Sequence, residues 1–91
     1  MEIQQQFEMA VANSKTLKEK PDNETLLKLY SLYKQATEGD CSAAQAPENP
    51  FDFVAKFKFE AWNGLSGTST TDAMQQYVSL VADLQSKQSL K

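Results

Sequence analysis

The chain has 91 residues, a formal net charge of −3, nine lysines, and neither arginine nor histidine. This acidic balance argues against general nucleic-acid binding, which needs a basic surface and usually arginine. Without histidine, Ser–His and Cys–His nucleophilic sites are excluded, and a zinc site would depend on one cysteine and carboxylates. The composition therefore favours binding over catalysis, with no catalytic residues, no metal and no cofactor.

The length corresponds to a single domain, residues 1–91, with one modest core. For a mass of 10.2 kDa, the folded surface should be about 5,300 Å². No apolar run approaches the roughly 18 residues of a membrane span, and MEIQQQFEMA lacks the basic and apolar regions of a signal peptide. One cysteine, Cys41, excludes an internal disulfide and agrees with a reducing compartment, so we expect a cytoplasmic protein.

The first two predicted helices span residues 2–17 and 22–37. The first has the spacing of an amphipathic helix and should end before Pro21, because the residue preceding a proline avoids helical geometry. Asp22 or Pro21 is placed near the cap of the second helix, and Gly39 is placed to end it. The apolar residues that define the two stripes are Ile3, Phe7, Ala10, Val11 and Leu17 in the first, and Leu26, Leu27, Leu29, Tyr30, Leu32, Tyr33 and Ala36 in the second.

The last two predicted helices span residues 51–64 and 69–87, after an aperiodic loop at residues 39–50. Pro50 suits the first position of the third helix, and Ser69 with Asp72 resembles a capping box at the start of the fourth. Since the apolar positions follow helical spacing, we expect them in the core rather than at a ligand. The residues assigned to the core in this way are Leu26, Phe51, Phe57, Trp62, Met74 and Leu84.

The length of the middle loop bears on the topology. About twelve residues can span roughly 40 Å when extended, whereas a 16-residue helix is only about 24 Å long. The loop is therefore long enough to carry the chain back along the second helix, so that the second and third helices run parallel. With no strand-like alternation anywhere, the fold class is all-α, a four-helix bundle.

Three runs in fixed order, LYSLYKQATEGD, DFVAKFKFEAWNGLSGTS and DAMQQYV, resemble the acyl-CoA-binding protein family. Phe7, Leu17 and the Lys20-Pro21 pair fit the same pattern, so the resemblance covers about residues 5–85. It implies an up-down-down-up bundle, which agrees with the loop-length argument. It also implies non-catalytic binding, intracellular transport and pool maintenance of medium- to long-chain fatty acyl-CoA esters.

The resemblance further implies how the head group is held. Tyr30, Lys34 and Lys58 correspond to residues that bind the 3′-phosphate and adenine of coenzyme A. Tyr30 and Lys34 are four residues apart on one helix, so their tips should meet at one point. Two ammonium groups and a phenol supply the charge-assisted donors that a terminal phosphate needs, and tyrosine rings offer a stacking surface to a base.

Other implied contacts surround this head-group cluster. Tyr77 corresponds to a contact with the adenine–ribose region, Tyr33 to a residue lining the site, and Lys15 to a head-group lysine. The family differs at Val54, where many members have lysine, at Phe59, where tryptophan is common, and in a shorter 41–50 loop. The positions implied to flank the acyl chain with small or apolar side chains are Ala10, Val11 and Leu27.

Two alternative interpretations stand beside the carrier. From spacing alone, Tyr30 and Tyr33 are residues at the edge of a core and Lys34 is solvated, as in a helical interaction module without a small ligand. A thioesterase or acyltransferase is disfavoured by the missing histidine. We expect Glu38 to be a charged residue at a helix end, on the surface. The expected partners are fatty acyl-CoA and, transiently, acyl-CoA-using enzymes or membranes, with no nucleic acid and a monomeric protein.

Overall fold

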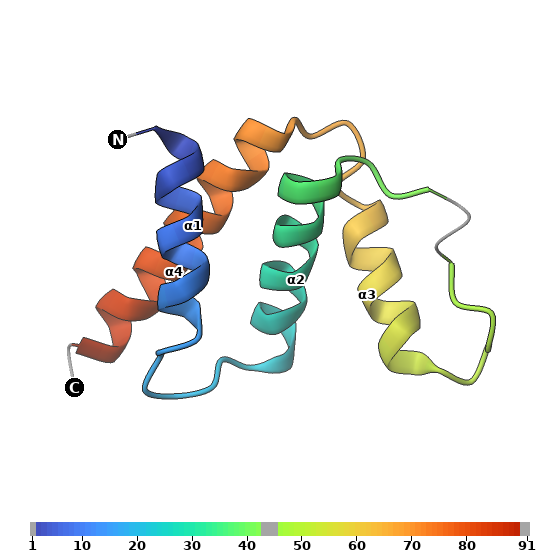
Figure 1. Ribbon diagram of the computed structural model, residues 1–91. Coiled ribbons are helices and arrows are strands. Elements are labelled where there is room, and N and C mark those ends of the chain that lie inside the picture. The colour runs from blue at the N-terminus through green and yellow to red at the C-terminus, as the bar shows by residue number, and fades with distance from the viewer. Residues whose placement is uncertain (1, 43–45, 90–91) are drawn as a thin grey trace.

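The computed structural model describes residues 2–42 and 46–89 and consists of four α-helices in those ranges. They are α1 (Ile3–Ser14), α2 (Asn23–Glu38), α3 (Phe53–Asn63) and α4 (Thr70–Ser89). Helix α1 runs down in Figure 1, α2 and α3 both run up, and α4 runs down again. This is the predicted up-down-down-up topology with α2 and α3 parallel, and it is confirmed. Residues 43–45 of the predicted middle loop lie outside the described residues.

The predicted caps of α2 and α4 are confirmed. The backbone N–H of Thr25 donates to Asp22 Oδ1 at 2.8 Å, and the N–H of Asp72 donates to Ser69 Oγ at 3.0 Å. Each bond satisfies an N–H group that has no partner within the first turn of its own helix. Gly39 ends α2 with a φ of 82°, a conformation that glycine adopts without a steric penalty.

The predicted bounds were wrong by two or more residues at three helix ends, one of which is the end of α4, at Ser89 rather than residue 87. Helix α1 ends at Ser14 rather than residue 17, because the N–H groups of Lys15 and Thr16 bond three residues back and tighten the chain into a turn. Helix α3 begins at Phe53 rather than residue 51. Asp52 Oδ1 accepts from the Ala55 N–H at 3.1 Å and so caps the helix, which leaves Pro50 in the preceding turn.

Helix α4 is the element that closes the core. It packs against both α1 and α2, and it crosses behind α1 in Figure 1. The core is apolar and comes from these three helices; its buried members are Phe7, Ala10, Leu29, Leu32, Ala36, Ala73, Met74, Tyr77 and Val81. The core position predicted for Met74 is therefore confirmed, while Leu26 and Leu84 are half-buried.

Helix α3 stands outside this core and packs against α2. Within α3, all of which the structure describes, Trp62 is the one residue that is buried, as predicted. The core positions predicted for Phe51 and Phe57 were wrong, since their side chains are 80% and 53% exposed. The face of α3 that carries Phe57 borders an open groove with α2, so its apolar stripe is only partly covered.

The outlying helix makes the molecule flat. The Cα atoms extend over 41 × 28 × 16 Å, with a radius of gyration of 13.8 Å. A compact chain of this length would have a radius of gyration of about 12 Å. The accessible surface, 6175 Å², likewise exceeds the roughly 5,300 Å² expected from mass. No helix in the described part of the chain has both the length and the apolar character needed to traverse a membrane.

Candidate ligand-binding site

Three neighbouring cavities share Tyr30 as a wall, and their volumes are about 330, 200 and 560 Å³. Tyr30 lies midway along α2 and is half-buried, so its ring reaches each of them. We refer to them as the tyrosine cavity, the lysine cavity and the apolar groove. Because one residue borders all three, we treat these adjacent cavities together as the candidate site along α2.

The tyrosine cavity lies between α1, α2 and the middle of α4. Its floor is Tyr77, which is 4% exposed and whose hydroxyl donates to Ser14 Oγ at 3.2 Å. The Phe7 ring packs edge-on against Tyr77 and stacks on Tyr33, with centroids 5.2 and 5.9 Å apart. This aromatic wall is rigid and offers flat surface with a hydroxyl at its edge. The cavity is lined by Val11, Ser14, Lys15, Pro21, Leu26, Leu29, Tyr30, Tyr33 and Tyr77.

The lysine cavity lies between α2 and α3. Lys58 Nζ is 5.2 Å from the centroid of the Tyr30 ring, and Lys34 Nζ is 5.2 Å from the centroid of the Trp62 ring. Each ammonium group thus faces an aromatic ring across the helix pair, a favourable electrostatic contact. The cavity is lined by Tyr30, Lys34, Pro47, Ala55, Lys58, Phe59 and Trp62.

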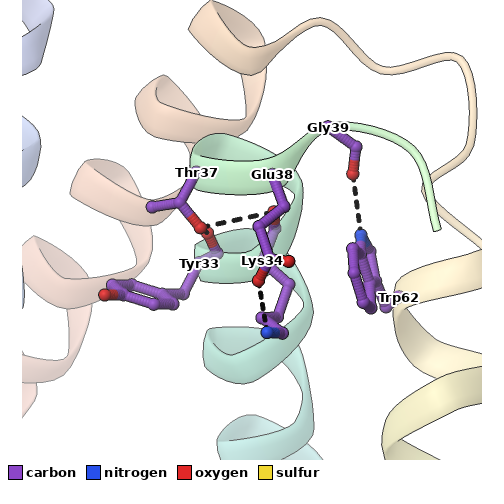
Figure 2. Close-up of polar contacts among 6 residues, drawn as sticks. All are labelled: Tyr33, Lys34, Thr37, Glu38, Gly39 and Trp62. Carbon is purple, nitrogen blue, oxygen red and sulfur yellow. Dashed lines mark hydrogen bonds and ion pairs between the residues drawn. The ribbon is translucent and has the colours of Figure 1, made fainter. Parts of the chain in front are cut away.

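Lys34 also has a carboxylate partner. Its ammonium group donates to Glu38 Oε2, one helical turn further along α2, and the two form an ion pair (Figure 2). This hydrogen bond raises the pKa of Lys34 above its ordinary value, more than partial burial lowers it. Lys34 is therefore a cation at any physiological pH.

The position of Trp62 fixes one wall of the lysine cavity. Its indole Nε1–H donates to the carbonyl oxygen of Gly39 at 2.9 Å, from α3 to the end of α2. Figure 2 shows this bond beside Lys34, with Tyr33 on the opposite side of α2. A buried indole needs a hydrogen-bond partner, and here that partner anchors α3 next to the lysine.

The apolar groove follows the first half of α2 and the first turns of α3. Its lining exposes mainly carbon, and the side chains of Leu26 and Leu27 on α2 face Val54 and Phe57 on α3. Val54 and Phe57 remain 64% and 53% exposed, so the groove opens to water along one side. The lining is completed by Asn23, Glu24, Tyr30 and Lys58.

Most of the predicted site residues line at least one of these three cavities. The tyrosine cavity holds Val11, Lys15, Tyr30, Tyr33 and Tyr77; the lysine cavity holds Tyr30, Lys34 and Lys58; and the apolar groove holds Tyr30, Leu27 and Lys58. Ala10 is the exception. It is buried in the core and borders a separate cavity of about 190 Å³ between α1 and α4.

Tyr33 and Lys34 are adjacent in sequence but line different cavities, because Tyr33 leaves α2 toward Phe7 on α1 whereas Lys34 leaves it toward Trp62 on α3. Tyr30 and Lys34, which were expected to meet, both line the lysine cavity.

One expectation needs correction: sequence reasoning placed Phe57 in the core, although it lines the groove. Val54 and Phe57 are three residues apart and therefore share one face of α3. This spacing predicts an apolar face, but it does not predict whether that face is buried or exposed.

Comparison with known proteins places these features in a family. The sequence profile described as "Acyl CoA binding protein" matches residues 4–81. An acyl-CoA-binding protein of Dictyostelium discoideum is 44% identical over 81 residues, which cover 89% of this chain and 94% of that protein. The crystal structure of acyl-CoA-binding protein 2 of Oryza sativa superposes with a TM-score of 0.89 at 34% identity, covering 99% of this chain and 98% of that one.

A longer relative contains the same region. Enoyl-CoA delta isomerase 2 of Rattus norvegicus is 49% identical over 83 residues, which cover 91% of this chain. The chain spans only about a fifth of that relative, 21% of its length. The region shared with it is therefore a part of a larger protein there. With a profile match over most of its length and a full-length relative above 40% identity, the chain belongs to the acyl-CoA-binding protein family.

Proposed function

We propose that this chain binds medium- to long-chain fatty acyl-CoA esters reversibly and without catalysis, and so carries and stores them as a monomeric, cytoplasmic, single-domain protein. The observation that carries the proposal is the sharing of Tyr30 between a cavity with two ammonium groups and an open apolar groove. A ligand with an anionic nucleotide at one end and a hydrocarbon chain at the other matches both parts at once.

The head group is assigned to the lysine and tyrosine cavities. Lys34 and Lys58 both line the lysine cavity with Tyr30, so a phosphate placed there meets two cations and a phenol. Charge-assisted bonds to phosphate are roughly twice as strong as neutral ones. The rings of Tyr30, Tyr33 and Tyr77 supply the surface on which an adenine base can stack, a contact worth about 1–3 kcal/mol. Lys15, at the mouth of the tyrosine cavity, adds a third cation for the pyrophosphate.

The acyl chain is assigned to the apolar groove. Each methylene transferred from water contributes about 0.8 kcal/mol, so a chain of sixteen carbons gains on the order of 10 kcal/mol before association costs. Leu26, Leu27, Val54 and Phe57 provide the apolar contacts. Because the groove is open on one side, part of that gain is lost, and the affinity should rise with chain length until the groove is filled.

A calorimetric titration with esters of increasing acyl length tests the proposal. Affinity should rise from octanoyl- to palmitoyl-CoA, and equal affinity for free coenzyme A and palmitoyl-CoA would refute the acyl assignment. Lys34→Ala should weaken binding more than tenfold, because it removes a cation from the lysine cavity. Lys56→Ala is the matched control. It removes an exposed lysine of α3 that lines none of the three cavities, and it should leave the affinity unchanged.

A helical interaction module is the second candidate. The exposed apolar side chains of Phe51, Phe53, Val54 and Phe57 favour it, since exposed apolar patches mark contact surfaces. Folded protein that shows no binding of palmitoyl-CoA in the titration would support this candidate over the carrier.

A further inference from the structure

Lys34, the cation on which the head-group assignment depends, already has an anionic partner. Its ammonium group lies between the Glu38 carboxylate and the face of Trp62 (Figure 2). The side chains of Lys34 and Glu38 are 26% and 43% exposed, so a ligand can reach the pair from solvent. A phosphate that enters the lysine cavity therefore competes with a carboxylate of the same chain.

Helix stability does not account for Glu38. It is the last residue of α2, where the negative end of the helix dipole disfavours an acidic side chain. The order along the helix, lysine first and glutamate four residues later, is also the weaker arrangement for such pairs. Asp40 adds another negative charge two residues on. The position of Glu38 is thus better explained by its contact with Lys34 than by support of the helix.

We propose that Glu38 is an internal competitor for the ligand's 3′-phosphate and sets the affinity of the head-group site. In the empty site its carboxylate holds the Lys34 ammonium group against Trp62. Binding exchanges that ion pair for one with the phosphate, so breaking the Lys34–Glu38 pair offsets part of the free energy gained. The phosphate therefore contributes less to affinity than Lys34 alone would allow, and the returning carboxylate favours release. This inference rests on the proposed acyl-CoA function.

The variant Glu38→Gln isolates this effect, because it keeps the shape of the side chain and removes its charge. Because ligand binding no longer has to break the Lys34–Glu38 ion pair, this variant should bind palmitoyl-CoA about two- to fivefold more tightly. That gain corresponds to the free energy of a typical exposed ion pair. Palmitoyl-dephospho-CoA lacks the 3′-phosphate, so its affinity should change by less than about 1.5-fold. Glu60→Gln, which removes an exposed carboxylate of α3, is the charge-matched control and should leave both affinities unchanged.

A double variant shows whether the effect passes through Lys34. In a Lys34→Met background, Glu38→Gln should no longer change the affinity for palmitoyl-CoA, because the pair is already broken. Equal gains for both ligands, a similar gain from Glu60→Gln, or a persisting gain without Lys34 would each overturn the inference. Weaker binding by Glu38→Gln would also overturn it, since Glu38 would then position Lys34 for the ligand.

The same titrations distinguish a failure of the proposed role of Glu38 from a failure of the proposed acyl-CoA function. If the wild-type chain binds palmitoyl-CoA and Glu38→Gln behaves like wild type, the role of Glu38 is wrong and the acyl-CoA function stands. If the wild-type chain does not bind palmitoyl-CoA, the function fails and the inference fails with it. Thermal unfolding of each variant, expected to match wild type because Glu38 is exposed, verifies that the compared proteins are folded.

Discussion

The body formed by α1, α2 and α4 and the outlying helix α3 use apolar residues in different ways. In the body, stripes on three helices cover one another and bury Phe7, Leu32 and Val81 to 6% exposure or less. In α3, Trp62 is buried while Phe53, Val54 and Phe57 are each more than half exposed. The difference shows that amphipathic spacing specifies a face of a helix, and that only the neighbouring helices decide whether that face becomes core or binding surface.

The two regions are joined at the end of α2. Trp62 donates to the Gly39 carbonyl, and Asp40 Oδ1 accepts from both Gln35 Nε2 and the Gly67 N–H at 2.8 and 2.9 Å. Gln35 is fully buried and also donates to the carbonyl of Thr68. This junction therefore ties α2 to the end of α3 and to the turn before α4.

The largest expected effect comes from removing the buried anchor of α3. Trp62→Ala should lower the free energy of unfolding by about 3–5 kcal/mol, the range for a buried aromatic side chain, and should abolish ligand binding. Urea denaturation followed by circular dichroism measures the loss. Phe57→Ala on the exposed face is the control and should stay within about 0.5 kcal/mol of wild type. Similar losses for both variants would contradict the division into body and outlying helix.

The junction offers the second test. Gln35→Leu removes the donor to Asp40 and leaves the carbonyl of Thr68 without this partner, so stability should fall by about 1–3 kcal/mol. Gln75→Leu on the exposed side of α4 is the matched substitution and should have an effect near zero. Chemical denaturation compares the two. A neutral Gln35→Leu would mean that packing, and not this polar contact, holds the turn before α4.

A substitution on the exposed face of α3 tests ligand binding and should leave the stability of the fold unchanged. Val54→Asn should weaken palmitoyl-CoA about three- to tenfold, because roughly 1 kcal/mol of apolar contact is lost, and should leave free coenzyme A unaffected. Met9→Asn makes the same uncharged polar change at an exposed methionine of α1 that borders none of the three cavities of the site. If both variants lose affinity equally, the loss does not come from contact with the groove.

The smallest expected effect is in the pH dependence of stability. Hydrogen bonds from Thr25 and from Gly67 and Gln35 lower the pKa values of Asp22 and Asp40, respectively, in the folded state. Since the unfolded chain takes up protons at higher pH than the folded one, this stabilisation is present above about pH 5 and is lost as the pH falls below about 4. Thermal unfolding between pH 6 and 2 should show a shallower decline for Asp40→Asn than for wild type. An identical decline would exclude a contribution from this junction carboxylate.

Much of the fold could be predicted because its signals are local. Asp22 and Ser69 cap their helices through bonds to residues three positions on, and the long middle loop allows α2 and α3 to run parallel. The start of α3 was misplaced because Pro50 and Asp52 are both good signals and sequence does not rank them. Phe51 and Phe57 were misplaced because their exposure depends on how the neighbouring helices pack, which no local pattern encodes.

The site was less accessible to sequence reasoning than the fold. Resemblance singled out Tyr30, Lys34 and Lys58, which line one cavity, but the four-residue spacing alone did not show that Tyr33 turns toward α1. The partnership of Lys34 with Glu38 was visible as an i, i+4 pair, although most such pairs are ordinary surface contacts. The cation–aromatic contacts join α2 to α3, so only the structure reveals them.

The thinness of the molecule has a consequence for cargo exchange. With a shortest Cα extent of 16 Å, the described part of the chain is about two helix layers deep, too thin to surround a hydrocarbon tail on all sides. If the acyl chain lies in the apolar groove, as we propose, one edge of that chain faces water. We then expect delivery to an acceptor by sideways transfer from that edge, with the amide protons of α1 and α4 protected throughout.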